Sequence, residues 1–270
     1  MVWKNYQPLN GTVFSGAFRV SRRLFLGGLV LVPIMAHGIS VSVTDSIVVL
    51  DERSRSGEID LLSMTPSPVE FEVAPDDLPD EVNDGRDYLR WAPERTVVPA
   101  NRSRPLRMVF RPPADLPAGE YIVRLAVQSR EVDYEPDFGD SESEEDDQGL
   151  SVGVALQPVL PVTVYIRHNV NSPTLSVGAF TPSPDDADTH GYFTVSKPPE
   201  AISYIGTVAL VGASSGERYT KGRLRMGNTV DEQRIRVPRL ENDARLEEAV
   251  CLQLWPEFPA RGEPEQTVCQ

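Results

Sequence analysis

Histidine is scarce in this sequence, and its scarcity limits the chemistry that the chain can perform. Only three of the 270 residues are histidines, namely His37, His168 and His190. None of them has a second ligand at the spacing that a metal ion requires. The nearest approach to a ligand cluster is a polar loop of Asp185, Asp186, Asp188 and His190. A solvated loop explains that group better than a metal centre, so we expect no metal and no cofactor.

Signatures of common enzymes are also missing. The sequence has no glycine-rich phosphate loop ahead of a helix and no Gly-x-Ser-x-Gly nucleophile elbow. Carboxylates are numerous, but in an acidic β protein their number says little about glycosidase chemistry. We therefore expect a protein that is not an enzyme; the enzymatic alternative would need an unrecognised carboxylate site.

Long helical patterns are absent too. No long segment repeats apolar residues at helical spacing, whereas short alternating runs are separated by turn residues, and the chain holds 24 prolines and 19 glycines. Such a pattern is typical of an all-β protein. A length of 270 residues favours two domains.

Basic residues are outnumbered by acidic ones, and the formal net charge is −14. Residues 1–38 contain four basic side chains and no acid, so the chain without them would carry −18. This charge argues against binding of nucleic acid or anionic lipid through bulk electrostatics.

Residues 1–38 have the features of an export signal. An apolar run from Leu24 to Met35 is followed by the small-x-small site Ala36-His37-Gly38. The run is too short to span a bilayer about 30 Å thick. Ser21-Arg22-Arg23-Leu24-Phe25-Leu26 resembles the twin-arginine motif of bacterial export signals, and the alternative is an ordinary Sec signal.

Residues 151–167 form the longest alternating segment. Apolar side chains occupy nearly every second position: Val152, Val154, Leu156, Leu160, Val162, Val164 and Ile166. Successive side chains of a strand point to opposite faces, so the pattern predicts one long strand with an apolar face. Pro158 and Pro161 mark it as an edge or bulged strand, because proline cannot donate to a ladder.

Shorter strands are expected on both sides of this segment. In residues 39–168 the alternation predicts strands at 41–50, 58–62, 69–73, 88–92, 106–110, 121–127 and 151–167, which suits an immunoglobulin-like sandwich. Residues 168–173 form the expected hinge. In residues 169–270 the alternation of apolar residues predicts strands at 191–195, 202–205, 207–211, 234–237 and 249–255, which favours a second, smaller sandwich.

The two cysteines, Cys251 and Cys269, both follow the export signal. An even pair in an exported protein favours a disulfide. The alternative, a thiol nucleophile, lacks a neighbouring histidine.

Residues 131–149 hold ten acids and no base. A segment of this charge repels itself and buries little apolar surface, so we expect disorder when the protein is free. One interpretation is a solvated hairpin loop. The other is that the negative charge of this segment prevents the adjacent apolar strand from pairing with the same strand of another copy.

Several segments together resemble the first domain of periplasmic pilus-assembly chaperones. In chain order they are Trp91-Ala-Pro93 with Val97-Val-Pro99, Arg104-Pro-Leu-Arg-Met-Val-Phe-Arg111, Leu116-Pro-Ala-Gly-Glu-Tyr-Ile-Val-Arg-Leu125, and Leu160-Pro-Val-Thr-Val-Tyr-Ile-Arg167. The resemblance covers roughly residues 41–170, and the long loop before the last strand resembles the archaic or spore-coat branch of that family.

The resemblance implies a function in the periplasm. Chaperones of this family lend a β-strand to a pilin subunit that lacks its last strand, and deliver the subunit to an outer-membrane usher. The lending residues in this chain would be Val152, Val154, Leu156 and Leu160. The alternative is that these side chains pack only in the protein's own core.

The family also anchors the carboxylate of the subunit between two basic residues, on the first and last strands of the domain. Here those positions hold Ser46 or Ile47 and Thr163, which are not basic. The candidate substitutes are Arg167, Arg90 and Arg107.

The expected partners are a pilin-like subunit and an usher, with a self-capping homo-oligomer of the free protein as a further expectation. The alternative function is an exported immunoglobulin-like structural or adhesion protein.

Overall fold

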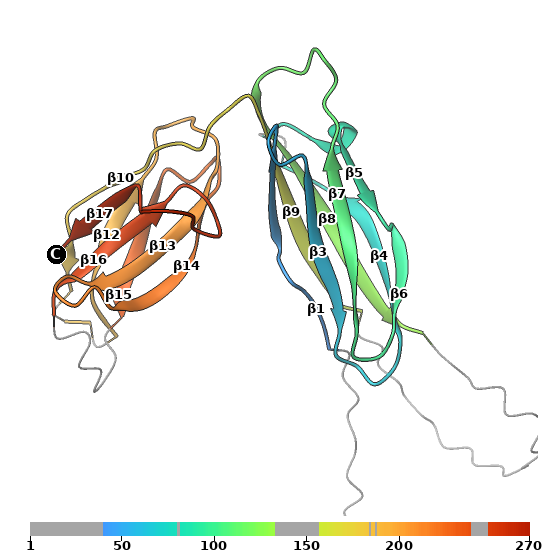
Figure 1. Ribbon diagram of the computed structural model, residues 1–270, viewed down its shortest axis with the longest axis horizontal. Coiled ribbons are helices and arrows are strands. Elements are labelled where there is room, and N and C mark those ends of the chain that lie inside the picture. The colour runs from blue at the N-terminus through green and yellow to red at the C-terminus, as the bar shows by residue number, and fades with distance from the viewer. Residues whose placement is uncertain (1–39, 80–81, 133–156, 184, 187, 239–247) are drawn as a thin grey trace, which may run out of the picture. The chain divides into compact units, whose positions relative to one another are not determined.

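The structure is a computed structural model that describes residues 40–79, 82–132, 157–183, 185–186, 188–238 and 248–270. Regular structure in these residues is β-strand, apart from the short 3-10 helix η1 (Arg86–Tyr88). The strands build two sandwiches, each with its own hydrophobic core (Figure 1). The prediction of an all-β protein with two immunoglobulin-like sandwiches is therefore confirmed.

Residues Gly38–Gln270 form one compact unit, so both sandwiches belong to it. The predicted export signal, residues 1–38, lies outside the described residues, as does most of the acidic segment 131–149. Within the described ranges, no helix is long and apolar enough to cross a membrane.

The first sandwich consists of the strands up to residue 168. They are β1 (Val41–Val43), β2 (Ile47–Asp51), β3 (Ser56–Ser63), β4 (Val69–Asp76), β5 (Leu89–Ala92), β6 (Arg95–Val98), β7 (Ser103–Phe110), β8 (Gly119–Glu131) and β9 (Val159–His168). One sheet has the order β1-β3-β7-β5 and the other has the order β2-β9-β8-β4-β6. The layer that contains β3 and β7 covers the layer that contains β8 and β4 (Figure 1).

Alternation along the strands creates the core between these layers. Val69, Phe71 and Val73 on β4 are buried, as the sequence predicts, while the residues between them are only half-buried. Leu125 on β8 and Leu106 on β7 are fully buried in the same cluster. Each such side chain contributes roughly 1.5–3 kcal/mol through its removal from water.

The N-terminal strand changes sheets. β1 pairs with β3, whereas β2 pairs in parallel with β9, from Ile47 opposite Thr163 to Asp51 opposite Arg167. Between them the Asp45 carboxylate accepts a hydrogen bond of 2.9 Å from the Ile47 N–H and so fixes the turn. The sequence predicts one interrupted strand over 41–50; the interruption moves the chain from one layer to the other.

Within the described residues, the last strand of this sandwich starts later than the sequence predicts. β9 begins at Val159, directly after Pro158, and ends at His168. Residues 151–156 of the predicted strand lie outside the described residues. β6, a strand of four residues, was not predicted from the sequence.

The second sandwich follows from residue 176. Its strands are β10 (Ser176–Val177), β11 (Thr181–Pro182), β12 (Thr189–Ser196), β13 (Tyr204–Gly212), β14 (Arg218–Met226), β15 (Glu232–Pro238), β16 (Val250–Trp255) and β17 (Gln266–Cys269). One sheet joins β10, β11 and β15 to β12, and the other has the order β14-β13-β16-β17.

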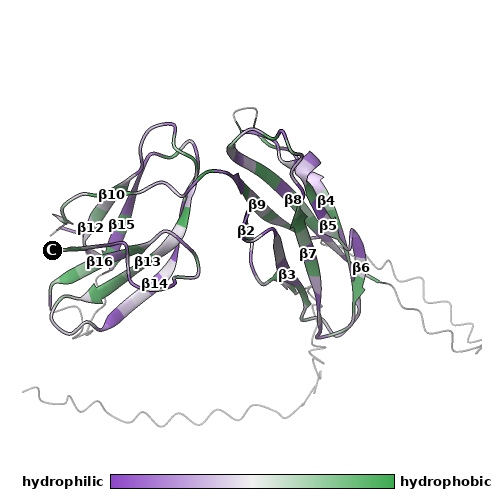
Figure 2. Cartoon of the chain, turned by 45° about the horizontal axis from the view of Figure 1, so that its top comes forward, coloured by the Kyte–Doolittle hydropathy of each residue, from purple (hydrophilic) through white to green (hydrophobic). Residues whose placement is uncertain are grey.

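β14 was missed by the sequence analysis because it is rich in basic residues and carries few apolar ones. Only Leu224 and Met226 of this strand are buried. Figure 2 shows the difference, since β16 is mainly hydrophobic whereas β14 is pale or hydrophilic. Two predicted strands, 202–205 and 207–211, are one strand, β13.

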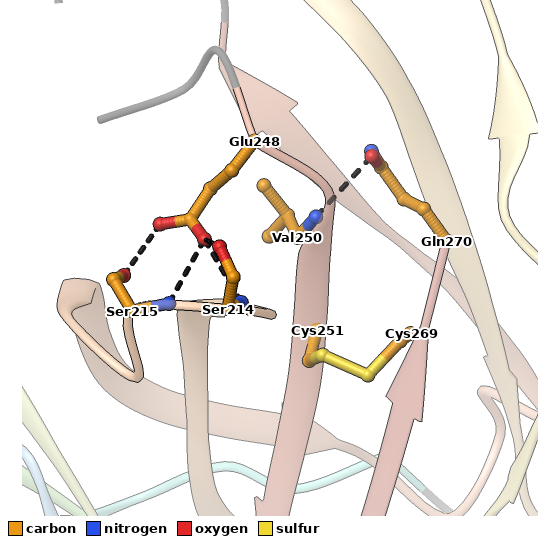
Figure 3. Close-up of a disulfide and its surroundings, with 7 residues drawn as sticks. All are labelled: Ser214, Ser215, Glu248, Val250, Cys251, Cys269 and Gln270. Atoms are coloured by element: carbon orange, nitrogen blue, oxygen red, sulfur yellow. Dashed lines mark hydrogen bonds between the residues drawn. A yellow bond between two sulfur atoms is a disulfide. The ribbon is translucent and has the colours of Figure 1, made fainter. Parts of the chain in front are cut away.

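The disulfide prediction is confirmed. Cys251 and Cys269 face each other across β16 and β17 and form a disulfide (Figure 3). The bond spans 18 residues of sequence. A disulfide that closes a loop of this length stabilises the folded state by about 3 kcal/mol, because it reduces the conformational entropy of the unfolded chain.

Candidate functional site

The two edges of β9 are covered to different extents. On one side β8 pairs with the whole strand, from Val159 to His168. On the other side β2 begins only at residue 163, where the Thr163 N–H donates to the Ser46 carbonyl at 2.8 Å. Among the described residues, no strand pairs with that second edge over residues 159–162, so we call these four residues the open edge.

Side chains of the open edge alternate between water and core. Val159 is 52% exposed, whereas Val162 is fully buried. Leu160 is half-buried and packs against the core of the first sandwich. Val152, Val154 and Leu156, the other three predicted lending residues, lie outside the described residues. The described strand therefore presents an unpaired backbone edge with one apolar side chain in water.

The following residues of β9 belong to the protein's own core. Val164 and Ile166 are fully buried in the first cluster. The C-terminal part of the predicted long strand therefore packs inside the first sandwich.

Arg167, one of the predicted carboxylate anchors, already has internal partners. It is 8% exposed, its Nη2 donates to the Ser203 carbonyl at 2.8 Å, and its Nε lies 3.7 Å from Glu120 Oε2. The other oxygen of Glu120 accepts a bond of 2.9 Å from the Ser203 N–H. Burial raises the pKa of Glu120 and lowers the pKa of Arg167, because each charge is removed from water. This group joins β8 and β9 to the segment before β13.

Arg90 and Arg107, the two other predicted anchors, lie on β5 and β7, in the sheet that does not contain β9. Arg90 donates to the carbonyls of Asp87 and Leu89, at 3.1 and 2.9 Å. Arg107 forms an exposed ion pair of 2.7 Å with Glu58. The structure therefore does not bring the three predicted arginines together.

The positions that the resemblance assigned to the two anchoring residues, Ser46 or Ile47 and Thr163, lie beside each other. Ile47 on β2 lies directly opposite Thr163 on β9. Neither side chain is basic.

A cavity of about 320 Å³ opens beside Thr163. Its lining includes Arg124 on β8, Tyr165 on β9 and Arg225 on β14, with an apolar wall that contains Ile122. Arg124 is the cross-strand partner of Thr163. Sequence reasoning missed both arginines, because only the register between β8 and β9 reveals the first and the second lies on a strand that was not predicted.

Arg225 is held in place by Tyr165. Its Nε donates to the Tyr165 hydroxyl at 2.7 Å, and the guanidinium lies 5.6 Å from the centre of the ring. Arg124 donates through Nη1 to the Asp77 carbonyl at 3.3 Å. Within the described part of the chain, neither arginine forms an ion pair with a carboxylate.

The two histidines of the described residues take no part in this site. His168 ends β9, and its Nδ1 lies 2.7 Å from the Glu52 carboxylate. His190 lies on β12. Of the described residues, no three histidine, cysteine, aspartate or glutamate side chains are placed to hold a metal ion.

The fold defines a class of protein, a two-domain chain of immunoglobulin-like sandwiches. No family model and no curated protein matches the sequence. Solved structures with a similar fold include the YadV chaperone, with a TM-score of 0.43 and 13% identity over 85% of this chain and 99% of that one. The Salmonella enterica SafA pilin in complex with the SafB chaperone gives 0.45 and 12% over 86% and 95%, and the Pseudomonas aeruginosa CupB2 chaperone gives 0.40 and 14% over 85% and 99%.

Proposed function

We propose that this protein is a periplasmic chaperone that binds an incomplete, pilin-like β subunit by lending it a strand. The observation that carries the proposal is the open edge of β9. There β8 covers one side of the strand, and of the described strands β2 reaches the other side only from Thr163 onward.

An open edge of this kind needs a partner. Unpaired N–H and C=O groups on a sheet edge are a template for another strand, and soluble proteins usually cover or charge such edges. Here the open edge carries Val159 in water and follows directly on an alternating apolar stretch that includes Val154 and Leu156. Backbone bonds would supply affinity, and the alternating side chains would fill the groove of the subunit.

This mechanism requires no reaction. Each Val or Leu that a subunit buries contributes roughly 1.5–3 kcal/mol before the cost of ordering the segment. Three or four such residues suffice to hold a subunit without a cofactor. The protein is then a carrier and not an enzyme, and it would release the subunit at an outer-membrane usher.

The direct test is capture of the native partner. We expect that the protein isolated from its own periplasm carries a small pilin-like protein, identified by mass spectrometry. The Val154→Asp, Leu156→Asp double variant should fold normally and lose that partner, because two charges cannot enter an apolar groove.

The matched control is Val97→Asp. Val97 is 44% exposed on β6, the opposite edge of the same sheet, so its replacement adds a charge without touching β9. This variant should capture the subunit as the wild type does. If the double variant unfolds instead, residues 154 and 156 belong to the protein's own core, and the structural or adhesion function takes the place of the chaperone.

A further inference from the structure

The two prolines of the predicted long strand face opposite sides of it. The Thr163 N–H of β9 donates to the Ser46 carbonyl, on the side of the open edge. The Pro158 carbonyl accepts a bond of 3.2 Å from the Ser129 N–H of β8, on the other side. Because the backbone groups of successive residues in a strand alternate between its two edges, Pro161 faces the open edge, whereas Pro158 faces β8.

The open edge therefore offers fewer donors than its length suggests. Within residues 159–162, only Val159 and Pro161 direct backbone groups to that edge, since those of Leu160 and Val162 point to β8. Val159 has an N–H and a carbonyl, but proline lacks the N–H and supplies a carbonyl alone. A strand that pairs along this edge finds two acceptors and one donor, so one of its own carbonyls has no partner opposite Pro161.

The missing donor has a different weight for a foreign strand and for a second copy of this protein. A foreign strand meets one residue 161 and loses one hydrogen bond. Two copies that pair through this edge in a two-fold arrangement lose two bonds, because each copy supplies the same strand. Each missing bond weakens association by about fivefold, and two weaken it by about 25-fold.

We propose that Pro161 makes the open edge select a foreign strand over a second copy of this protein. This inference rests on the proposed function and deepens it, because it names the residue that keeps the lending strand available. A sheet edge with a full set of donors is a template for self-association, and proline on an edge strand is one means of preventing it. The self-capping homo-oligomer expected of the free protein would then require a different surface.

The ring of Pro161 has no packing role that would explain the residue instead. Pro161 is exposed, while its neighbours Leu160 and Val162 contribute to the core of the first sandwich. Its cross-strand partner on β8 is Ala126, whose small side chain leaves room for other residues at 161. Replacement of Pro161 by alanine or valine therefore adds a backbone donor with little effect on packing.

The test measures self-association of the full chain by sedimentation equilibrium. Pro161→Ala and Pro161→Val each restore the donor, so both variants should dimerise about 25-fold more tightly than the wild type. The matched control is Pro158→Ala, which also removes a proline but adds its N–H on the side of β8. This control should associate as the wild type does.

A further variant locates the contact between the copies. Val159→Asp in the Pro161→Ala background places like charges on the facing strands of a two-fold pair. The double variant should therefore return to the self-association of the wild type. Circular dichroism checks that every variant is folded.

A synthetic peptide of alternating valine and threonine serves as the foreign strand. Fluorescence anisotropy measures its affinity at protein concentrations below those at which dimers form. We expect Pro161→Ala to bind the peptide only about fivefold more tightly than the wild type, since one donor is restored in place of two. The preference for the foreign strand over a second copy should therefore fall about fivefold in this variant.

The outcomes separate this inference from the proposed function. Pro161 variants that self-associate no more than the wild type would overturn the inference, and capture of the subunit by the same proteins would leave strand lending standing. Equal gains in Pro161→Ala and Pro158→Ala, or different gains in Pro161→Ala and Pro161→Val, would also overturn it, because the missing donor would not be the cause. If the Pro161 variants dimerise but no peptide binds and no subunit is captured, the proposed function is wrong, and so is the selection of a foreign strand.

Discussion

Glu248 fixes the turn between β13 and β14 through a single carboxylate. It accepts hydrogen bonds from the N–H groups of Ser214 and Ser215, at 2.9 and 3.0 Å, and from both serine hydroxyls (Figure 3). The Tyr219 hydroxyl donates a further hydrogen bond of 2.6 Å to the same carboxylate. The hydroxyl donors hold the pKa of Glu248 well below its usual value of 4.5. Burial, together with this carboxylate, raises the pKa of Tyr219 to about 12.

This residue predicts how stability depends on pH. Because the folded-state pKa of Glu248 is lowered, its contribution is complete above pH 4.5 and is lost as the pH falls below that value. The Glu248→Gln variant should therefore melt below the wild type at pH 7, and the difference in Tm should shrink towards pH 3. Thermal unfolding followed by circular dichroism at pH 7, 5, 4 and 3 measures it.

The control for this prediction is Glu263→Gln, which removes a charge from an exposed position of the same sandwich. It should change Tm little at any of these pH values. A Tm difference for Glu248→Gln that stays constant from pH 7 to pH 3 would contradict the role of its charge.

At the scale of elements, β13 and β14 each contain a glycine, and the two positions differ in the space they leave for a side chain. A Cβ built on Gly206 of β13 would lie 2.2 Å from the Trp255 carbonyl oxygen and 2.6 Å from the Tyr204 hydroxyl. A Cβ on Gly222 of β14 would meet nothing within 4 Å. The glycine of β13 is thus required by close packing, whereas that of β14 is not.

This contrast predicts the outcome of two matched substitutions. Gly206→Ala should destabilise the second sandwich by about 1–3 kcal/mol, because the extra methyl forces the neighbouring strand and ring to move. Gly222→Ala should change stability by less than about 0.5 kcal/mol. Denaturant titration measures both, and equal losses in the two variants would show that the space around Gly206 adjusts freely.

At the scale of the whole molecule, the two sandwiches have separate cores. Phe71 is fully buried in the first and Phe193 in the second. Contacts also join the sandwiches, among them the ion pair of Asp45 and Arg223. A small buried cluster of Ile122, Tyr165 and Ile205 also joins them. The two main cores nevertheless have no residue in common, so we expect them to unfold as distinct units.

Substitution of one phenylalanine at a time tests this independence. Phe71→Ala should cost about 3–5 kcal/mol and increase hydrogen exchange in β4 and β8, with a smaller effect in β12 and β13. Phe193→Ala should reverse the pattern. Hydrogen exchange followed by mass spectrometry resolves the segments, and a uniform increase over the chain in either variant would mean that the molecule unfolds as one unit.

The sequence alone determined the class of fold and much of its content. The alternation of Val69, Phe71 and Val73 predicted an inward face. Successive side chains in a strand point to opposite faces, so neighbouring residues alone show which side chains share a face. The pairing of Cys251 with Cys269 could be predicted because the sequence contains only these two cysteines. By contrast, the basic strand β14 was missed, since its neighbours and not its own side chains make it a strand.

The candidate site depended on register, which no local pattern contains. Val162 and Leu160 were visible in the sequence as alternating apolar residues, but the open edge exists because β2 starts at Ile47 opposite Thr163. Arg124 became a candidate only when β8 placed it beside Thr163, and Arg225 only when a second sandwich placed it by Tyr165. Strand order and register arise from pairing between residues far apart in the chain, so the tertiary structure alone decided which arginines share a cavity.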